Sequence, residues 1–425
     1  MLDFRQVASF IPQIMQELQD SGTQQYESLQ VALETLKKSS SQSQELKNRY
    51  LRDAQKVTWL VGLPLENPDQ VYALPKIKKE YQVAATDGSG FELSRHDLAP
   101  GYLINIGRVF LAYTKDSRAE LDNVVSTHFA EEDLFTGEKA RKTRVKSAHI
   151  NLIRDQKELG ELASLASSKQ VDLALVDGSL IRWTLESVED DFKKNYLKEY
   201  LKVLVSFEKA GLALASYISL SNSTEATNFL RIAICPYDPM NCDTCPDLPC
   251  NKVDGVLDRS VFAEKLKPGE RSVLFESRSK ILKEYGQQTI YFFYLHVGSE
   301  IARVEVPKYV ADEKKLLDQV HGLLYDQAQK GQGYPVSLME AHEQAVVTMH
   351  DKELFLTMLE QELVRQGRKV KRTEKSLSKK RRIVGLLWLR HCYIVNNVPA
   401  IRLGGPKESQ KDKSLIDQKY FGIED

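Results

Sequence analysis

The sequence predicts an α/β protein in which helices flank a mixed β-sheet. Between residues 81 and 219, short apolar runs typical of strands alternate with longer stretches whose apolar residues recur every three or four positions, as in helices. The chain has 425 residues, of which 42% are hydrophobic, so it can bury a large core and exceeds one average domain. These two observations favour a sizeable globular protein built from alternating strands and helices.

The first 57 residues are expected to form an N-terminal helical arm. The segments 4–18 and 26–38 carry apolar residues at helical spacing, and the polar run "SSSQSQ" at 39–44 interrupts the pattern. Such an arm can serve in dimerisation or can pack on the rest of the chain, and the sequence leaves both uses open.

The next part of the chain contains the elements of the predicted sheet. We expect strands at 81–89, 102–113 and 123–130, a helix at 140–168, a strand at 171–180, a helix at 189–210 and a strand at 211–219. This order, β-β-β-α-β-α-β, resembles the ribonuclease H-like fold, whose central strands carry metal-binding acids.

A hairpin and two helices are predicted downstream. Residues 290–307 form two strand-like runs, and in the second run apolar residues alternate with Arg303 and Glu305. Strict alternation predicts a strand with one polar face. Helices are expected over 312–329 and 335–366.

Two apolar runs end in the same three residues, Asp-Gly-Ser, at Asp87 and at Asp177. Asp-Gly is a common turn signal, but a matched pair after two strands favours a site, because α/β sheets place their chemistry at strand tips. Neighbouring carboxylates repel each other unless a divalent cation, which prefers oxygen ligands, lies between them. The intervening helix offers Glu158 and Glu161 as a further ligand, although most helical glutamates are solvated.

Tyr334 and His342 are later candidates, at the start of the last predicted helix and about two turns inside it. His342 is surrounded in sequence by Leu338, Ala341 and Ala345, so we expect it to face inward. A buried histidine needs a polar partner, which a metal site or a phosphate would supply.

Taken together, the two Asp-Gly-Ser segments, "GYP…EAHEQAVV" and "FFYLHVGSEIARVEVPKYVA" resemble the NurA nuclease family, most closely its bacterial members, over about residues 81–362. The resemblance implies a ribonuclease H-like fold and nuclease activity on DNA that depends on Mn²⁺, with Mg²⁺ as the alternative ion. It also implies a homodimer that works with the hexameric HerA helicase-translocase in resecting double-strand break ends during DNA repair.

The resemblance carries site residues over as well. Asp87 and Asp177 match the metal-binding aspartates, and Tyr334 and His342 match the late active-site pair. The family also has a glutamate on the helix before the second aspartate. Glu158 is favoured for this role and Glu161 is the alternative.

Four of the five cysteines lie close together, at Cys235, Cys242, Cys245 and Cys250. In a cytosolic protein this crowding favours a metal over disulfides, either structural zinc or an iron–sulfur cluster, with free or redox-active thiols as the alternative. The segment has four prolines and little apolar material, so a metal would supply folding free energy. We interpret 235–250 as an insertion.

The charge balance places no bulk constraint on partners, because Lys+Arg and Asp+Glu are both 59. One stretch, 365–382, is nevertheless strongly basic, and we expect it to contact DNA phosphates, unless it is only a solvated tail. Its last cluster is Lys379, Lys380, Arg381 and Arg382. No apolar run is long enough for a membrane span and the N-terminus lacks a signal-peptide layout, so a cytoplasmic protein is expected.

We therefore predict an N-terminal arm at 1–57, a NurA nuclease domain at 75–365 and a basic extension at 366–425. Two alternatives come from other classes. An actin-like phosphotransferase would use the Asp-Gly loops on ATP phosphates, and a non-catalytic adaptor would use the arm and the cysteine segment to hold a translocase.

Overall fold

The computed structural model describes residues 3–93, 98–136 and 142–368. The chain forms two compact units, each assembled from three separate segments. Unit 1 contains Met1–Val83, Gln170–Trp183 and Leu201–Val336, and unit 2 contains Ala84–Lys169, Thr184–Tyr200 and the chain from Ser337 onward. The domain boundaries expected from the sequence stay a prediction.

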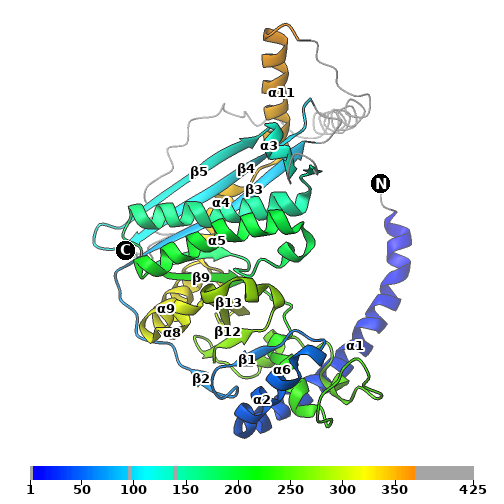
Figure 1. Ribbon diagram of the computed structural model, residues 1–425. Coiled ribbons are helices and arrows are strands. Elements are labelled where there is room, and N and C mark those ends of the chain that lie inside the picture. Colours follow the sequence, from blue (N-terminus) through cyan, green and yellow to red (C-terminus); the bar gives the residue numbers. More distant parts are fainter. Residues whose placement is uncertain (1–2, 94–97, 137–141, 369–425) are drawn as a thin grey trace, which may run out of the picture. The chain divides into compact units, whose positions relative to one another are not determined.

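Unit 1 is built on a mixed sheet (Figure 1). Its strands lie in the order β1 (Gly62–Pro64), β11 (Phe275–Ser277), β12 (Ile290–His296), β13 (Ile301–Pro307), β9 (Ala213–Ile218) and β8 (Leu173–Asp177). Strands β8 and β9 are parallel, and the other neighbours are antiparallel. Two short strands, β2 (Val71–Tyr72) and β10 (Arg271–Ser272), pair beside β12. The predicted α/β class with a mixed sheet and flanking helices is confirmed.

Strand β8 lies in the core of unit 1, and only Asp177 at its end is partly exposed. Its first four residues, 173–176, are all apolar and fully buried, as its nearly continuous apolar sequence predicts.

Strand β13 has the predicted polar face, but this face is buried. Arg303 is 2% exposed and Glu305 is 1% exposed. Arg303 Nε donates to Glu305 Oε1 at 3.0 Å, and Arg303 Nη1 donates at 2.6 Å to Oε1 of Glu225, on helix α6 (Glu225–Ile234). Each of these buried charges has an ion-pair partner inside the unit, so the alternation marks a buried network rather than a solvated face.

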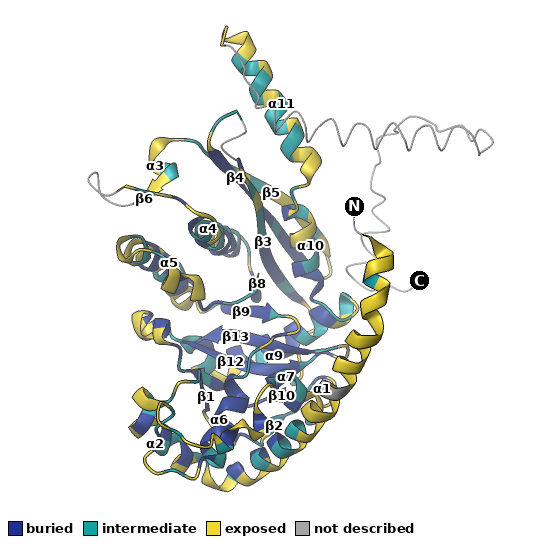
Figure 2. Cartoon of the chain, turned by 90° about the vertical axis from the view of Figure 1, so that its right-hand side faces the viewer, coloured by how far each residue is buried: buried dark blue, intermediate teal, exposed yellow. Residues whose placement is uncertain are grey.

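The N-terminal helical arm is also confirmed. Helix α1 (Phe4–Ser39) and helix α2 (Ser43–Asp53) are separated by a 3₁₀ turn, Ser40–Gln42, inside the predicted polar break. The second half of α1 packs against α2 and α6, whereas its first half exposes Phe4, Phe10, Ile11, Ile14, Met15 and Leu18 (Figure 2).

Unit 2 contains an antiparallel meander and helices on both of its faces. Strands β3 (Tyr81–Leu93), β4 (Gly101–Tyr113) and β5 (Arg118–His128) follow one another, and the first three residues of β3 belong to unit 1. Helix α4 (Ser147–Ser168) covers one face and α10 (Val336–Ala345) covers the other (Figure 2). Helix α4 begins seven residues later than the predicted 140.

The single helix predicted over 335–366 is wrong, because it is two helices, α10 and α11 (Met349–Arg365). Thr348 accepts a hydrogen bond from the Asp351 backbone N–H, and the Asp351 carboxylate accepts from the Thr348 backbone N–H. This reciprocal cap starts a new helix and so breaks the continuous pattern. Among the described residues, no helix combines the length and the apolar character of a membrane span.

Candidate functional site

Asp87 lies within strand β3, not at its end as the sequence suggested. The strand continues to Leu93, so the first Asp-Gly-Ser is not a turn. Asp87 Oδ1 accepts a hydrogen bond from the Gly88 backbone N–H at 2.8 Å, and Asp87 Oδ2 lies 2.7 Å from His342 Nδ1. The side chain of Asp87 is 14% exposed and that of His342 is 63% exposed, so a protected carboxylate meets an accessible imidazole.

The expectation that His342 faces inward is wrong. Its neighbours in sequence, Leu338, Ala341 and Ala345, are buried, whereas the side chain of His342 is largely exposed and contacts Asp87 of β3. Helix α10 is held close to the sheet at Gly107, where a Cβ would collide with the Ala341 carbonyl. The helix sits against β4 through a residue without a side chain, and this close approach leaves His342 beside Asp87.

Glu158 is brought next to the first Asp-Gly-Ser segment. It is 5% exposed on α4, and a Cβ at Gly88 would collide with its Oε1. The glycine after Asp87 therefore makes room for the glutamate. Thr86 Oγ1 donates to the Glu158 carbonyl at 3.1 Å and ties α4 to β3 at this point. Asp87 and Glu158 thus flank the same glycine.

Glu161 is directed to a different partner. It accepts a hydrogen bond from Arg108 Nη1 at 3.1 Å, and Arg108 also pairs with Asp122 on β5. The carboxylate that lies beside Gly88 is that of Glu158. Arg154, four residues before Glu158, lies 3.1 Å from Glu158 Oε1 through its Nε.

Asp177 ends strand β8 in unit 1, and here the second Asp-Gly-Ser is a turn. Gly178 has a φ of +76°, a conformation that favours glycine. Its N–H donates to Asp177 Oδ1 at 2.9 Å, as the Gly88 N–H does to Asp87, and to the Tyr217 carbonyl at 3.0 Å. Asp177 is paired in register with Tyr217 of β9.

Tyr334 bonds to the same oxygen of this carboxylate as the Gly178 N–H. Its hydroxyl donates to Asp177 Oδ1 at 3.0 Å, and its ring meets the Tyr217 ring edge-on at 5.2 Å. The Tyr217 hydroxyl donates to Glu300 Oε1 at 2.6 Å. Burial, followed by this hydrogen bond to Glu300, raises the pKa of Tyr217 well above its ordinary value, so this phenol stays protonated and fixes the tyrosine pair.

The turn after Asp177 is fixed by a buried carboxylate. Glu305 Oε2 accepts hydrogen bonds from Ser179 Oγ and from the Leu180 backbone N–H, both at 2.8 Å. The same glutamate pairs with Arg303 through its other oxygen. The second serine of the repeated motif is therefore anchored by β13, and this holds the end of β8 in place.

The candidate ligands are of the type that a hard divalent cation prefers. Asp87, Glu158 and Asp177 each carry carboxylate oxygens, the ligands that Mg²⁺ and Mn²⁺ favour. In the parts of the chain that the structure describes, no group of three or more His, Cys, Asp or Glu residues forms a ready-made metal site. Asp87 and Glu158 belong to unit 2, and Asp177 belongs to unit 1.

Residues 81–347 match the family model of the NurA domain, which is more than half of the chain. The chain belongs to the NurA family. The matched region contains Asp87, Glu158, Asp177, Tyr334 and His342, the five residues favoured from the sequence.

Several solved structures match the chain, among them the following two. The NurA nuclease from Sulfolobus solfataricus matches with 14% identity and a TM-score of 0.46, covering 77% of this chain and 95% of that one. RuvC from Thermus thermophilus matches with 12% identity and a TM-score of 0.16, covering 43% and 95%. No curated protein matches the chain. Membership of the family rests on the NurA domain match.

The cysteine segment lies within the NurA domain match, and it is better anchored than its sequence suggests. Arg49 of α2 donates to the carbonyls of Ile232 and Cys235 at 2.9 Å, and Asp53 Oδ2 accepts from the Met240 N–H at 2.8 Å. Met240 is 1% exposed in an apolar cluster shared with α1, α2 and α6. The expectation that this segment has little apolar material to hold it is wrong, because Cys235 and Met240 belong to this cluster.

None of the four cysteines of the segment forms a disulfide with another described residue. Cys235 and Cys250 are buried, and Cys242 and Cys245 are partly buried. Burial raises the pKa of the Cys242 thiol and, against the opposing effect of Arg231, that of Cys250. Like the carboxylates, these thiols do not form a ready-made metal site in the described part of the chain. A bound zinc or iron–sulfur cluster stays a prediction.

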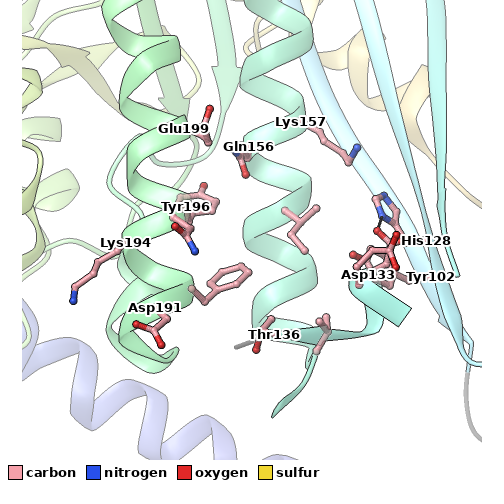
Figure 3. Close-up of a pocket in the computed structure, with 15 residues that line it drawn as sticks. Tyr102, His128, Asp133, Thr136, Gln156, Lys157, Asp191, Lys194, Tyr196 and Glu199 are labelled. Atoms are coloured by element: carbon pink, nitrogen blue, oxygen red, sulfur yellow. Dashed lines mark hydrogen bonds and ion pairs between the residues drawn. The ribbon is translucent and has the colours of Figure 1, made fainter. Parts of the chain in front are cut away.

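Unit 2 also contains a cavity of about 730 Å³, which neither Asp87 nor Glu158 lines (Figure 3). It lies between α4 and the first part of α5 (Asp190–Ala210), with Tyr102, His128 and Asp133 opposite. None of the favoured site residues lines it. His128 is already engaged, because it stacks on Tyr102 at 4.4 Å and its Nδ1 lies 3.1 Å from Asp133.

The residues that position Glu158 and Asp177 were not predicted from the sequence. Arg154 could have been noticed from its four-residue spacing before Glu158. Glu300, Tyr217 and Glu305 had no comparable signal, because their role depends on strand register. Lys379, Lys380, Arg381 and Arg382 lie outside the described residues.

Proposed function

We propose that this NurA-family chain is a divalent-metal-dependent nuclease that hydrolyses phosphodiester bonds in DNA. One observation carries the proposal: each copy of the repeated Asp-Gly-Ser presents a carboxylate held by its glycine N–H and by one late residue. Asp87 is held with His342 and Asp177 with Tyr334. A purely structural role for the two segments would not require a second, late residue bonded to each carboxylate.

The proposed metal ligands are Asp87, Asp177 and Glu158, with Mn²⁺ or Mg²⁺ as the ion. When bound, such an ion activates the attacking water and stabilises the leaving oxygen. Glu158 is preferred to Glu161 because its carboxylate lies against Gly88, whereas Glu161 is paired with Arg108. Arg154 balances the charge of Glu158 and would have to share it with the cation.

The chain's own groups supply binding and proton transfer. His342 is exposed and contacts Asp87, so it can orient a phosphate or carry a proton, the usual task of an active-site histidine. The Tyr334 hydroxyl donates to Asp177 and fixes that carboxylate.

The proposal extends to partners by the resemblance to the family. We infer a homodimer that works with a HerA-type helicase-translocase in end resection, in the cytoplasm. The exposed apolar residues of the first half of α1 support a protein partner there, because contiguous apolar surface marks interaction sites. The basic stretch after α11 would add affinity for DNA.

The decisive experiment is a manganese-dependent cleavage assay on linear duplex and single-stranded DNA. Asp87→Asn and Asp177→Asn keep the shape of the side chains and remove their charge. We expect each to lower the cleavage rate by more than about 100-fold, since even outer partners of a metal site cost 10–100-fold. Full activity in Asp177→Asn would refute the metal site.

A matched control is available on the same segment. Asp172 precedes β8 and accepts a hydrogen bond from the Gln82 N–H at 2.9 Å, so Asp172→Asn changes the same chemistry away from the site. It should cleave normally. ATP binding without cleavage would favour the phosphotransferase alternative, and translocase binding without either would favour the adaptor.

A further inference from the structure

A second cavity lies in unit 1 beside the turn that follows Asp177. It has a volume of about 460 Å³. Ser179 and Trp183 line it from that turn, residues 221–225 line it from the segment after β9, and Arg303 and Glu305 line it from β13. Ser179 is two residues from Asp177, so this cavity opens next to a proposed metal ligand.

The cavity is lined by the buried guanidinium of Arg303, which has one unused hydrogen-bond donor. Arg303 uses Nε for Glu305 and Nη1 for Glu225 and Ser223. Its Nη2 has no hydrogen-bond partner among the described residues, although Arg303 is only 2% exposed. A buried donor without an acceptor is costly, so an oxygen that enters the cavity would gain a strong interaction.

The charges around the cavity disfavour a phosphate. One arginine faces two glutamates, Glu225 and Glu305, which would repel an anion. The other walls are the apolar side chains of Leu60 and Ile218 and the ring of Trp183, which is 38% exposed. An aromatic face, apolar walls and a few polar groups suit a neutral, flat, polar ligand.

We propose that this cavity, the base pocket, receives one unpaired nucleobase of the strand being cut, stacked on Trp183 and, in thymine, cytosine or guanine, with an exocyclic carbonyl oxygen directed to Arg303. This inference rests on the proposed nuclease function and adds a substrate preference to it. A base can enter only after it leaves the duplex stack, so single-stranded or frayed ends should be preferred over paired ones.

The test measures binding without cleavage, in EDTA, of a fluorescently labelled single-stranded DNA. One abasic residue is moved along this DNA, position by position. In the wild-type protein an abasic residue at one position should weaken binding by about 5- to 160-fold, the range of base–aromatic stacking. In Trp183→Ala this position-specific loss should vanish.

Two variants separate stacking from folding. Trp183→Phe keeps an aromatic face but loses the Nε1–H that donates to Ser179 at 3.3 Å, and it should keep most of the position-specific loss. Trp59→Ala removes another tryptophan of unit 1, one that does not line the cavity, and should keep all of it. Thermal melting checks that each variant is folded.

Three results overturn the base pocket. They are a flat abasic scan in the wild type, an unchanged loss in Trp183→Ala, or no DNA binding at all. A flat scan together with manganese-dependent cleavage refutes the pocket alone. No binding and no cleavage refutes the proposed function with it.

Discussion

Replacing Glu305 by glutamine should be far more costly than the same change at a partly exposed pair of the same chemistry. Glu305 Oε1 faces Arg303 Nε, and its Oε2 faces two donors, Ser179 Oγ and Leu180 N–H. Glutamine keeps one acceptor and gains an N–H donor, so on one side a donor meets a donor. Arg303 also loses one of its two carboxylates in the interior.

The magnitude follows from burial. Breaking a buried ion pair by removing one partner typically costs about 3–5 kcal/mol of unfolding free energy. The matched control is Glu276→Gln. Glu276 and Arg278 are also two residues apart on one chain and 2.7 Å from each other, but their side chains are 28% and 32% exposed, against 1% and 3% for Glu305 and Arg303. An exposed pair contributes about 0–1 kcal/mol.

Urea unfolding followed by circular dichroism measures both changes. We expect the midpoint to fall strongly in Glu305→Gln and little in Glu276→Gln. Cleavage by Glu305→Gln should also fall under conditions where the protein is folded, because Glu305 anchors the turn after Asp177. Equal free energies of unfolding for the two variants would show that the buried network does not hold this turn.

Four further predictions follow from the site, the core and the two segments outside them. Glu158→Gln should abolish metal-dependent cleavage while Glu161→Gln leaves it largely intact, as measured by initial rates. Burial lowers the pKa of His321 to about 4. The unfolded chain, with an imidazole pKa of about 6.5, binds a proton that the folded protein excludes. Stability should therefore fall by up to about 3 kcal/mol as the pH drops from about 6.5 to 4, and His321→Gln should remove this loss in urea unfolding. Cys242→Ser should lower the melting temperature and leave cleavage unchanged, with roughly one equivalent of zinc in the dialysed, reduced wild type. Neutralising residues 379–382 should reduce the log–log salt slope of duplex binding by about 0.9 for each phosphate that these side chains neutralise in the wild type.

Each of these predictions has a contradicting outcome. Equal loss of cleavage in both glutamate variants would remove the assignment of Glu158. If the free energy of unfolding depends on pH in the same way in the wild type and in His321→Gln, this histidine has the same pKa in the folded and unfolded chains. Zinc and iron both below about a tenth of an equivalent per chain would leave four ordinary thiols. An unchanged salt slope would mean that the basic stretch does not touch phosphate.

The parts of the fold that follow from local pattern could be predicted from the sequence. The first four residues of strand β8 are apolar because both faces of the strand are covered there, and α1 shows helical spacing along its length. The division between α10 and α11 could not be read from periodicity. It depends on a cap at Thr348, which interrupts an apolar pattern that otherwise continues.

The candidate site shows the same limit more sharply. Glu158 and Glu161 are three residues apart, so they lie on nearly the same side of α4, and helical spacing cannot distinguish them. The distinction comes from their partners, since Gly88 leaves room for one carboxylate and Arg108 attracts the other. For His342, the apolar neighbours indicated an inward side chain, but the close approach at Gly107 turns those neighbours to the sheet and leaves the histidine beside Asp87.

The two copies of Asp-Gly-Ser are alike in sequence but different in chemistry. Each carboxylate accepts from its own glycine N–H. The first copy lies in a continuous strand and faces an exposed imidazole, while the second forms a turn and faces a phenol packed on Tyr217. An imidazole can exchange protons with substrate and solvent, whereas a packed phenol mainly fixes the atom it bonds. In the proposed nuclease, the repeat would therefore supply two carboxylates with separate tasks, one beside the group suited to proton transfer and one beside the proposed base pocket.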